Sequence, residues 1–348
     1  MLAQSDILPG MSALSRRNFL KLGAVALLGL AFKPLPPDDQ PLTELGRVTI
    51  EYLRVRQRPT PQAKQVGWKR LDEIVQIYNR VIGENASWRN PAWCEIEGGY
   101  VESAHLQPVE YRLNPVEAVS AESGFVGEIT VPFTDARRQP NPYSTVRYRL
   151  YYGSAFWVRG LERDADGQMW YKLYDERLVT HYYTPARAVR RLPENELSPL
   201  SPETENKKIV VNLSRQRLVA FEGNHEVFTT MISSGRLYFP PDSANARSWT
   251  PLGNFTLERK RPSRHMGNGE FAGSDYELPG VPWVSYFHWK GFAFHGAWWH
   301  NDFGYPRSAG CINMRPEEAR WLYRWSHPIP LPDQELTIGQ GTTVEIVE

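Results

Sequence analysis

The side chains in this sequence that could perform covalent chemistry lie close together in residues 295–314, HGAWWHNDFGYPRSAGCINM. Cys311 is one of two cysteines in the chain, and His295 and His300 precede it. A thiol with an ordinary pKa of about 8.5 is mostly protonated at neutral pH, but a neighbouring imidazole can accept its proton and create a nucleophilic thiolate. The pattern predicts either a cysteine nucleophile with a histidine base or a buried structural cysteine. Spacing alone does not separate these two interpretations.

The surroundings of His295 and Cys311 favour a catalytic pairing of these two residues. His295 closes the apolar run GFAFHG, which is typical of a strand end, and Cys311 follows the tight turn SAGC. A strand end, a loop and a return can place two such side chains next to each other. Gly310 removes side-chain bulk beside the sulfur and permits a turn that directs backbone N–H groups towards a developing oxyanion.

The elements that must position these residues are predicted to be mostly strands. KIVVNLSRQRLVAFEGNHEVFTTM indicates three strands with turns at SRQ and EGN, and TPLGNFTL and WVSYFHWKGFAFHG continue in the same style. RPEEARWLYRWS (315–326) indicates a helix, with Pro316 suited to its first turn and an apolar face at helical spacing. We therefore expect a β-rich domain over residues 206–348 with one helix after Cys311.

Two upstream segments, 45–112 and 113–192, form a weak repeat of strand-like runs with turns, which predicts two small antiparallel barrels. LRVRQRPTPQAKQVG (53–67) and GGYVESAHL (98–106) resemble the bacterial SH3-like wall-binding modules, and the second copy is more degenerate. The resemblance implies attachment to cell-wall glycan or peptide, with a purely structural spacer as the alternative. LPENELSPLSPETEN (192–206) contains a linker at residues 193–205.

The N-terminus is predicted to direct export. Arg16 and Arg17 precede an apolar run that is too short to span a bilayer, and residues 1–32 resemble a twin-arginine signal followed by a Pro-rich spacer at 33–44. An ordinary secretory signal or an uncleaved anchor is the alternative. We expect the segment to engage the export machinery and the protein to act in the cell wall or extracytoplasmic space. The net charge of +1 gives no basic excess for a nucleic-acid partner.

Residues 206–348 as a whole resemble the L,D-transpeptidase catalytic domain of the YkuD type. The family signature is a His-Gly, a loop, then Ser-His-Gly-Cys, an aliphatic residue, and Arg or Asn, and HGAWWHNDFGYPRSAGCINM follows it closely. KKIVVNLSRQRLVAFEGN resembles the family's first hairpin, TPLGNFTL (250–257) its Thr-Pro-x-Gly-x-Phe segment, and PWVSYFHWKGFAFHG the strand pair that delivers the base. The fold implied is mainly β.

The resemblance also implies roles for individual residues. Cys311 is the expected nucleophile, His295 the general base, and the main-chain carbonyl of Gly296 the group that orients the imidazole in place of a carboxylate. Ser308 and Gly310 belong to the turn that carries the thiol. The backbone N–H groups around Gly310 and Cys311 are the expected oxyanion donors.

One residue departs from the family pattern, because Ala309 stands where the family usually has a histidine. His300 is a candidate replacement, although a loop histidine more often faces solvent, so His300→Ala is expected to leave much of the activity. Asn313, Trp298 and Trp299 are further candidates for substrate binding, along with His300. Packing is an equal alternative for the two tryptophans.

Four residues outside the signature also have side chains suited to a cleft. Trp283 and Trp289 are predicted to be core residues rather than cleft residues. Arg264 and His265, in RPSRHMG, are predicted to lie on a solvated loop, with contact to substrate carboxylates as the alternative.

The resemblance implies acyl transfer on peptidoglycan stem peptides. The thiolate attacks the carbonyl of the third, diamino acid residue, terminal D-alanine leaves, and an amine of a second stem resolves the acyl-enzyme to give a 3→3 cross-link. Water as the acceptor would make the protein an L,D-carboxypeptidase. Sensitivity to carbapenems is a further implication, and we expect no cofactor and no metal.

Three other interpretations are weaker. A zinc site made of His295, His300 and Cys311 matches no common ligand spacing. A papain-like wall amidase needs its histidine well after the cysteine, where only His327 occurs. A non-catalytic wall-binding protein with a decayed site is supported by Ala309 alone.

Overall fold

The computed structural model describes residues 44–84, 87–120, 122–236, 249–267 and 277–348. The expected export signal at 1–32 and nearly all of the spacer at 33–44 lie outside these residues. The chain is mainly β, as the sequence predicted. Within the described ranges, no helix is long and apolar enough to cross a membrane.

Residues 44–109, here called the first module, contain two small antiparallel sheets. One has the order β4-β1-β8 and the other β3-β2-β7-β6-β5. Alternation along β2, which buries Leu53 and Val55 and exposes their neighbours, directs one face of each sheet to a shared core. The strands are β1 (Glu44–Val48), β2 (Tyr52–Arg56), β3 (Gln65–Arg70), β4 (Ile74–Ile77), β5 (Asn79–Ile82), β6 (Ala92–Ile96), β7 (Gly99–Glu102) and β8 (Leu106–Val109).

Residues 125–191, the second module, form one seven-stranded sheet with the order β11-β10-β14-β13-β12-β9-β15. Its core is a separate apolar cluster that includes Ile129, Leu150 and Leu173. The strands are β9 (Phe125–Ile129), β10 (Phe133–Arg137), β11 (Val146–Tyr151), β12 (Ala155–Arg163), β13 (Met169–Asp175), β14 (Thr180–Pro185) and β15 (Val189–Arg191). The likeness of the two modules to SH3-like domains stays a prediction from sequence.

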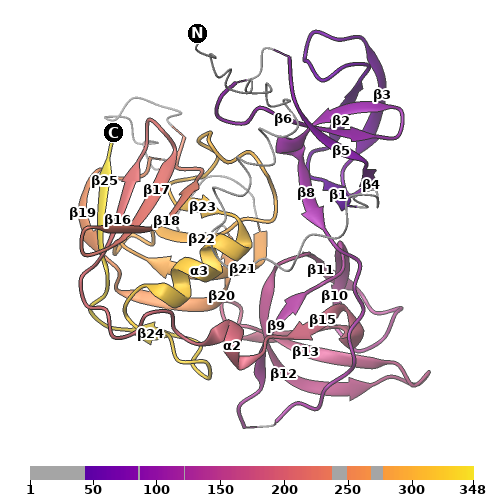
Figure 1. Ribbon diagram of the computed structural model, residues 1–348. Helices are drawn as coiled ribbons and strands as arrows, with labels where there is room; N and C mark the ends of the chain where they lie inside the picture. The colour runs from indigo at the N-terminus through magenta and orange to yellow at the C-terminus, as the bar shows by residue number, and fades with distance from the viewer. Residues whose placement is uncertain (1–43, 85–86, 121, 237–248, 268–276) are drawn as a thin grey trace, which may run out of the picture. The chain divides into compact units, whose positions relative to one another are not determined.

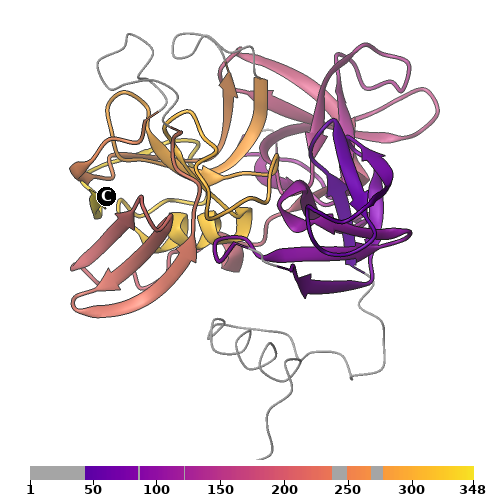
Figure 2. The ribbon, with the colours of Figure 1, turned by 90° about the horizontal axis from the view of Figure 1, so that it is seen from above.

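The C-terminal domain, residues 206–348, is built on two five-stranded sheets (Figures 1 and 2). The first has the order β18-β17-β16-β25-β19 and the second β23-β22-β21-β20-β24. The strands are β16 (Lys207–Asn212), β17 (Arg217–Glu222), β18 (His225–Met231), β19 (Gly253–Thr256), β20 (Arg259–Gly267), β21 (Glu277–Tyr286), β22 (Ala293–Gly296), β23 (Ile312–Met314), β24 (Thr337–Ile338) and β25 (Thr343–Val347). The predicted turns at SRQ and EGN separate β16, β17 and β18.

The predicted helix forms as α3 (Pro316–Trp325), which packs against β21 and β22. Glu318 accepts a hydrogen bond from the backbone N–H of Arg315 and so satisfies one of the free donors at the helix start. The apolar face of α3 joins a core that both sheets share, and Trp283 is buried in this core as predicted. The ammonium groups of Lys207 and Lys260 bind main-chain carbonyls at the helix end, where the helix dipole favours cations.

Two expectations about this domain were wrong. Arg264 and His265 lie within β20 rather than on a solvated loop, and His265 is 2% exposed, because β20 pairs with β21 and packs on the second module. Trp289 is 72% exposed rather than in the core, because it sits in the tight turn between β21 and β22. The linker also contains a short helix, α2 (Glu194–Leu197), that the sequence did not predict.

Candidate active site

The strand pair β22–β23 places the two expected catalytic residues on one face. The strands are parallel, with His295 opposite Asn313 and Phe294 opposite Ile312. Side chains alternate along a strand, so His295 and Asn313 share a face, and Cys311, just before β23, continues the same alternation. Cys311 is thus a diagonal neighbour of His295. Parallel neighbours need a long crossover connection, which accounts for the loop between the two residues.

The imidazole of His295 is oriented by the main chain. Its Nδ1 lies 3.0 Å from the carbonyl oxygen of Gly296, so this nitrogen donates its proton there and Nε2 keeps a free lone pair. The side chain is 3% exposed. Burial lowers the pKa of His295 to about 4, although the hydrogen bond to Gly296 acts in the opposite direction. At neutral pH the ring is therefore uncharged and able to accept a proton.

The thiol of Cys311 is half-buried and protonated at rest. Burial raises its pKa to about 11, while the backbone N–H of Ala293 acts to lower it. Within the described part of the chain, its sulfur hydrogen bond runs to the carbonyl oxygen of Gly291 at 3.8 Å. The thiol and the imidazole are thus both uncharged at neutral pH, and the ring can accept the thiol proton.

The turn that carries Cys311 is closed by hydroxyl groups. Ser308 Oγ accepts the N–H of Gly310 at 3.0 Å and donates to the carbonyl of Cys311, and Thr250 Oγ1 donates to the carbonyl of Gly310 at 2.8 Å. Gly310 has a φ of 126°, which strongly favours glycine. Its N–H, an expected oxyanion donor, is thus already engaged inside the turn. Sequence reasoning noticed the Thr-Pro motif but missed that Thr250 holds this turn.

His300 contacts Asn313 instead of facing solvent. Its Nδ1 accepts the backbone N–H of Asp302 at 3.2 Å, so Nε2 carries the proton in the neutral ring. Nε2 lies 3.0 Å from Asn313 Nδ2, and because Nε2 is a donor in this tautomer, the pair requires the amide to be turned so that its oxygen faces the ring. That orientation also gives a partner to a buried amide oxygen that otherwise lacks one among the described residues. Burial lowers the pKa of His300 to about 3.

The two neighbouring tryptophans differ in their surroundings. Trp298 is 5% exposed and stacks on Tyr151 of the second module, with 4.5 Å between ring centroids. Its main-chain carbonyl accepts a hydrogen bond from Arg47 of the first module. Trp299 is half-buried, with its ring 5.7 Å from that of His295. Trp298 thus packs between the modules, and Trp299 borders the base.

Residues 206–346 match the family model of YkuD, the L,D-transpeptidase catalytic domain. This segment is a YkuD-type L,D-transpeptidase domain. A putative L,D-transpeptidase, YciB, of Bacillus subtilis (strain 168) is 30% identical over 125 residues, which span 33% of this chain and 58% of that protein.

Solved structures of L,D-transpeptidases also resemble the chain. One from Enterococcus faecium is 23% identical and covers 42% of this chain and 51% of its own, with a TM-score of 0.31. One from Mycobacterium smegmatis is 18% identical and covers 68% of this chain and 100% of its own, with a TM-score of 0.32. L,D-transpeptidase 3 from Mycobacterium tuberculosis, in complex with a faropenem-derived adduct, is 20% identical. The match covers 41% of this chain and 60% of that chain, with a TM-score of 0.32.

The L,D-transpeptidase domain contains one further site residue that sequence reasoning missed. Asp302 is 4% exposed and pairs with Arg307, which precedes the turn that carries Cys311. Asn90 of the first module donates to Asp302 at 3.1 Å, and Ser233 donates to its main-chain carbonyl at 3.1 Å. Two contacts of the buried carboxylate and one of the main-chain carbonyl tie the loop together, but an isolated Asp in a loop has no pattern by which sequence could reveal it.

The site of the L,D-transpeptidase domain is suited to acyl transfer. It combines a thiol, an uncharged imidazole with a free lone pair, and a turn held in one conformation. Among the described residues, no group of three or more His, Cys, Asp and Glu side chains is arranged to hold a metal ion. Ala309 is exposed on the turn, so no imidazole projects from that position.

Proposed function

We propose that this protein is a peptidoglycan L,D-transpeptidase, with Cys311 as the nucleophile and His295 as the general base. The observation that carries the proposal is the parallel pairing of β22 with β23, which sets both residues on one face while the Gly296 carbonyl fixes the imidazole tautomer. The family of the C-terminal domain supports the stem peptide of the cell wall as the substrate class.

In the first half-reaction His295 Nε2 takes the thiol proton as Sγ attacks the carbonyl of the third stem residue. The tetrahedral oxyanion forms beside the backbone N–H of Cys311, since that of Gly310 is already bonded to Ser308. Collapse breaks the bond to D-alanine, and the imidazolium returns its proton to the leaving amine. A thioester between Cys311 and the stem remains.

In the second half-reaction an amine from another stem attacks the thioester. His295 takes a proton from this amine and returns it to the departing sulfur, so the thiol is restored. The product is an amide between the third residues of two stems, which is a 3→3 cross-link. An uncharged imidazole is required in both halves, and burial of His295 keeps it uncharged at neutral pH.

His300 and Asn313 support the base in this proposal. The family histidine is replaced by Ala309, yet the ring of His300 approaches the same face through its bond to Asn313, which lies opposite His295 in the register. We assign His300 to holding the Asn313 amide, which then contacts the bound stem. Trp299, next to the base, borders the same region.

The proposed substrate lies outside the cytoplasmic membrane, and the paired arginines Arg16 and Arg17 supply the expected export signal. Export to the cell wall therefore forms part of the proposal. Wall attachment through the first module rests on its sequence resemblance and stays a prediction.

The test is incubation of the full chain with purified disaccharide-tetrapeptide, followed by mass analysis of the products. We expect release of D-alanine and a cross-linked dimer, both absent with Cys311→Ala. A carbapenem should also add its mass to Cys311. If the wild type releases no D-alanine and takes no adduct, the proposal fails, and release of D-alanine with free tripeptide alone would reassign the acceptor to water.

A further inference from the structure

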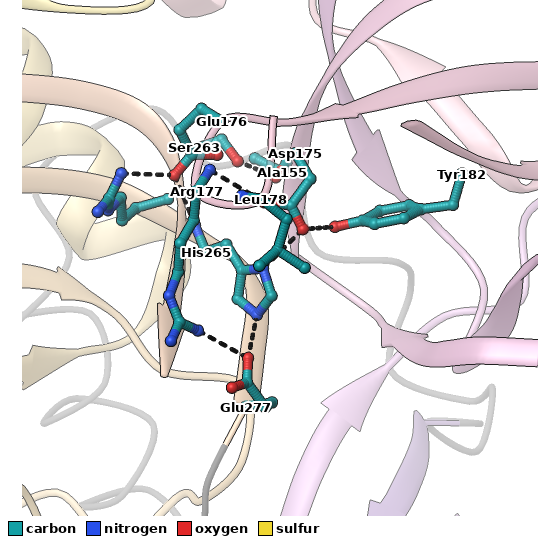
Figure 3. Close-up of polar contacts among 10 residues, drawn as sticks. Ala155, Asp175, Glu176, Arg177, Leu178, Tyr182, Ser263, His265 and Glu277 are labelled. Atoms are coloured by element: carbon teal, nitrogen blue, oxygen red, sulfur yellow. Dashed lines mark hydrogen bonds and ion pairs between the residues drawn. The ribbon is translucent and has the colours of Figure 1, made fainter. Parts of the chain in front are cut away.

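A buried charged contact joins the second module to the strand pair β20–β21 of the L,D-transpeptidase domain (Figure 3). His265, on β20, places Nδ1 2.7 Å from Asp175 Oδ2 at the end of β13. Its Nε2 lies 2.6 Å from Glu277 Oε2 at the start of β21. The exposed fractions of His265 and Asp175 are 2% and 1%. The imidazole is thus clamped between two carboxylates from different parts of the chain.

The charges in this cluster match one another. His265 Nδ1 is hydrogen-bonded to Asp175, whereas Nε2 lies within ion-pair distance of Glu277 and makes no hydrogen bond among the described residues. The guanidinium of Arg177 lies 2.8 Å from Glu277. Burial acts to raise the pKa of the Asp175 carboxyl, but hydrogen bonds from His265 and Tyr182 outweigh it and lower the pKa to about 2. Asp175 is therefore a carboxylate throughout the physiological range.

The neighbours of His265 on β20 extend the contact. The backbone N–H of His265 donates to Glu176 Oε1 at 2.9 Å, and Arg264 donates to the same oxygen at 3.0 Å. Ser263 donates to the main-chain carbonyl of Ala155, at the start of β12. The whole end of β20 is therefore fastened to the second module by directional hydrogen bonds, which set its position more narrowly than apolar contact would.

Residues of β20 and β21 also pack beside the thiol of Cys311, and this surface is here called the wall. Val281 and Val284 of β21 pack with Ala293 in a small apolar cluster, and Cys311 and Met266 pack against that cluster. β21 also pairs with β22, which carries the base. A shift of β20–β21 therefore moves the surface that a stem peptide meets when it approaches the sulfur.

We propose that His265 and Asp175 are positioning residues for acyl transfer, because they fix the wall of the acyl-donor site through the second module. The second module is then a structural part of the active site. The inference rests on the proposed function for its substrate, and the geometry predicts that loss of the clamp weakens donor binding more than it slows the chemical step.

The test compares His265→Gln, Asp175→Asn and the double variant in the full chain, with His225→Gln as a matched control at an exposed position of β18. At a temperature well below the melting point, we expect the KM for tetrapeptide to rise roughly tenfold or more in each single variant, with a smaller change in kcat. The double variant should be no worse than either single one, because both remove the same contact. The control should match the wild type.

A second readout does not depend on the proposed substrate. The rate at which iodoacetamide alkylates Cys311 reports how the wall covers the thiol, and it should change in the clamp variants but not in His225→Gln. Glu277→Gln is not expected to unfold the protein, because the side chain is 43% exposed. This variant should shift the KM and the alkylation rate in the same direction as the other clamp variants. Folded variants with wild-type KM and wild-type alkylation would overturn the inference. If the wild type does not turn over tetrapeptide, the proposed function fails. The comparison of alkylation rates still decides whether His265 and Asp175 position the wall beside Cys311.

Discussion

The guanidinium of Arg47, in the first module, donates a 2.9 Å hydrogen bond to the main-chain carbonyl of Trp298, in the loop between His295 and Cys311. Arg47 is 1% exposed and also pairs with Asp72 at 2.8 Å. Its guanidinium lies over the ring of Tyr151, which stacks on Trp298. Both modules therefore contact Trp298, which ties their packing to the loop between His295 and Cys311.

Replacement of Arg47 by methionine should destabilise the protein by about 3–5 kcal/mol, because it leaves the Gln107 side-chain oxygen and the Trp298 carbonyl buried without this donor. Urea denaturation measures the loss. Arg58→Met removes an exposed pair with Glu84 and should cost less than about 1 kcal/mol. Equal effects of the two substitutions would show that the buried contact adds nothing.

Alkylation of Cys311 should become faster as pH rises through the alkaline range, because burial raises the pKa of the thiol to about 11. Below that pKa, the fraction of Cys311 present as thiolate rises about tenfold for each unit of pH increase. Iodoacetamide labelling at several pH values, with Cys311→Ala to subtract reaction at Cys94, measures the profile. A plateau near neutral pH would instead reveal a thiolate–imidazolium pair at rest.

Acid should destabilise the folded protein through its buried histidines. The pKa values of His295 and His300 are lowered by burial to about 4 and about 3, whereas an unfolded histidine titrates near 6.5. The unfolded state binds more protons between these values, so stability is complete above about pH 6.5 and falls as the pH drops towards 4. Unfolding free energies at pH 7 and pH 4.5 test this, and His300→Gln should reduce the difference.

His300→Ala should reduce kcat/KM by roughly tenfold or more, since an unpaired buried amide at Asn313 costs about 1–3 kcal/mol. The sequence alone predicted that much of the activity would survive. His300→Gln, which can keep a hydrogen bond to Asn313, should recover part of the loss. Full activity in His300→Ala would restore the original expectation.

Thr250→Val should slow acylation of Cys311 while preserving side-chain shape. The Thr250 hydroxyl accepts the N–H of Gly235 at 2.9 Å and donates to the carbonyl of Gly310, so its removal leaves two buried groups unpaired at the nucleophile's turn. The rate of carbapenem adduct formation measures the effect. Thr180→Val, at an exposed position of β14, is the matched control, and equal acylation rates in both variants would contradict a role for Thr250.

Local patterns predicted much of the C-terminal domain. The mainly β class, the helix at 315–326 and the turns around β17 are confirmed, because each depends on hydrophobic period and turn residues within a short stretch. The family of residues 206–346 also followed from the motifs around His295 and Cys311. The error at RPSRHMG has a physical cause, since its charged residues look solvated until strong partners from the second module bury them.

By itself the sequence determined which reactive groups exist and which short elements carry them, including a histidine before a glycine at a strand end and a cysteine after a tight turn. Tertiary structure decided what each group meets: His300 binds Asn313, Arg47 binds the Trp298 carbonyl, and His265 binds Asp175. The contacts of Arg47 and His265 join segments far apart in the chain, and that of His300 spans the loop between β22 and β23. Their strength comes from burial and from geometry between elements, and neither leaves a period or spacing in the local sequence.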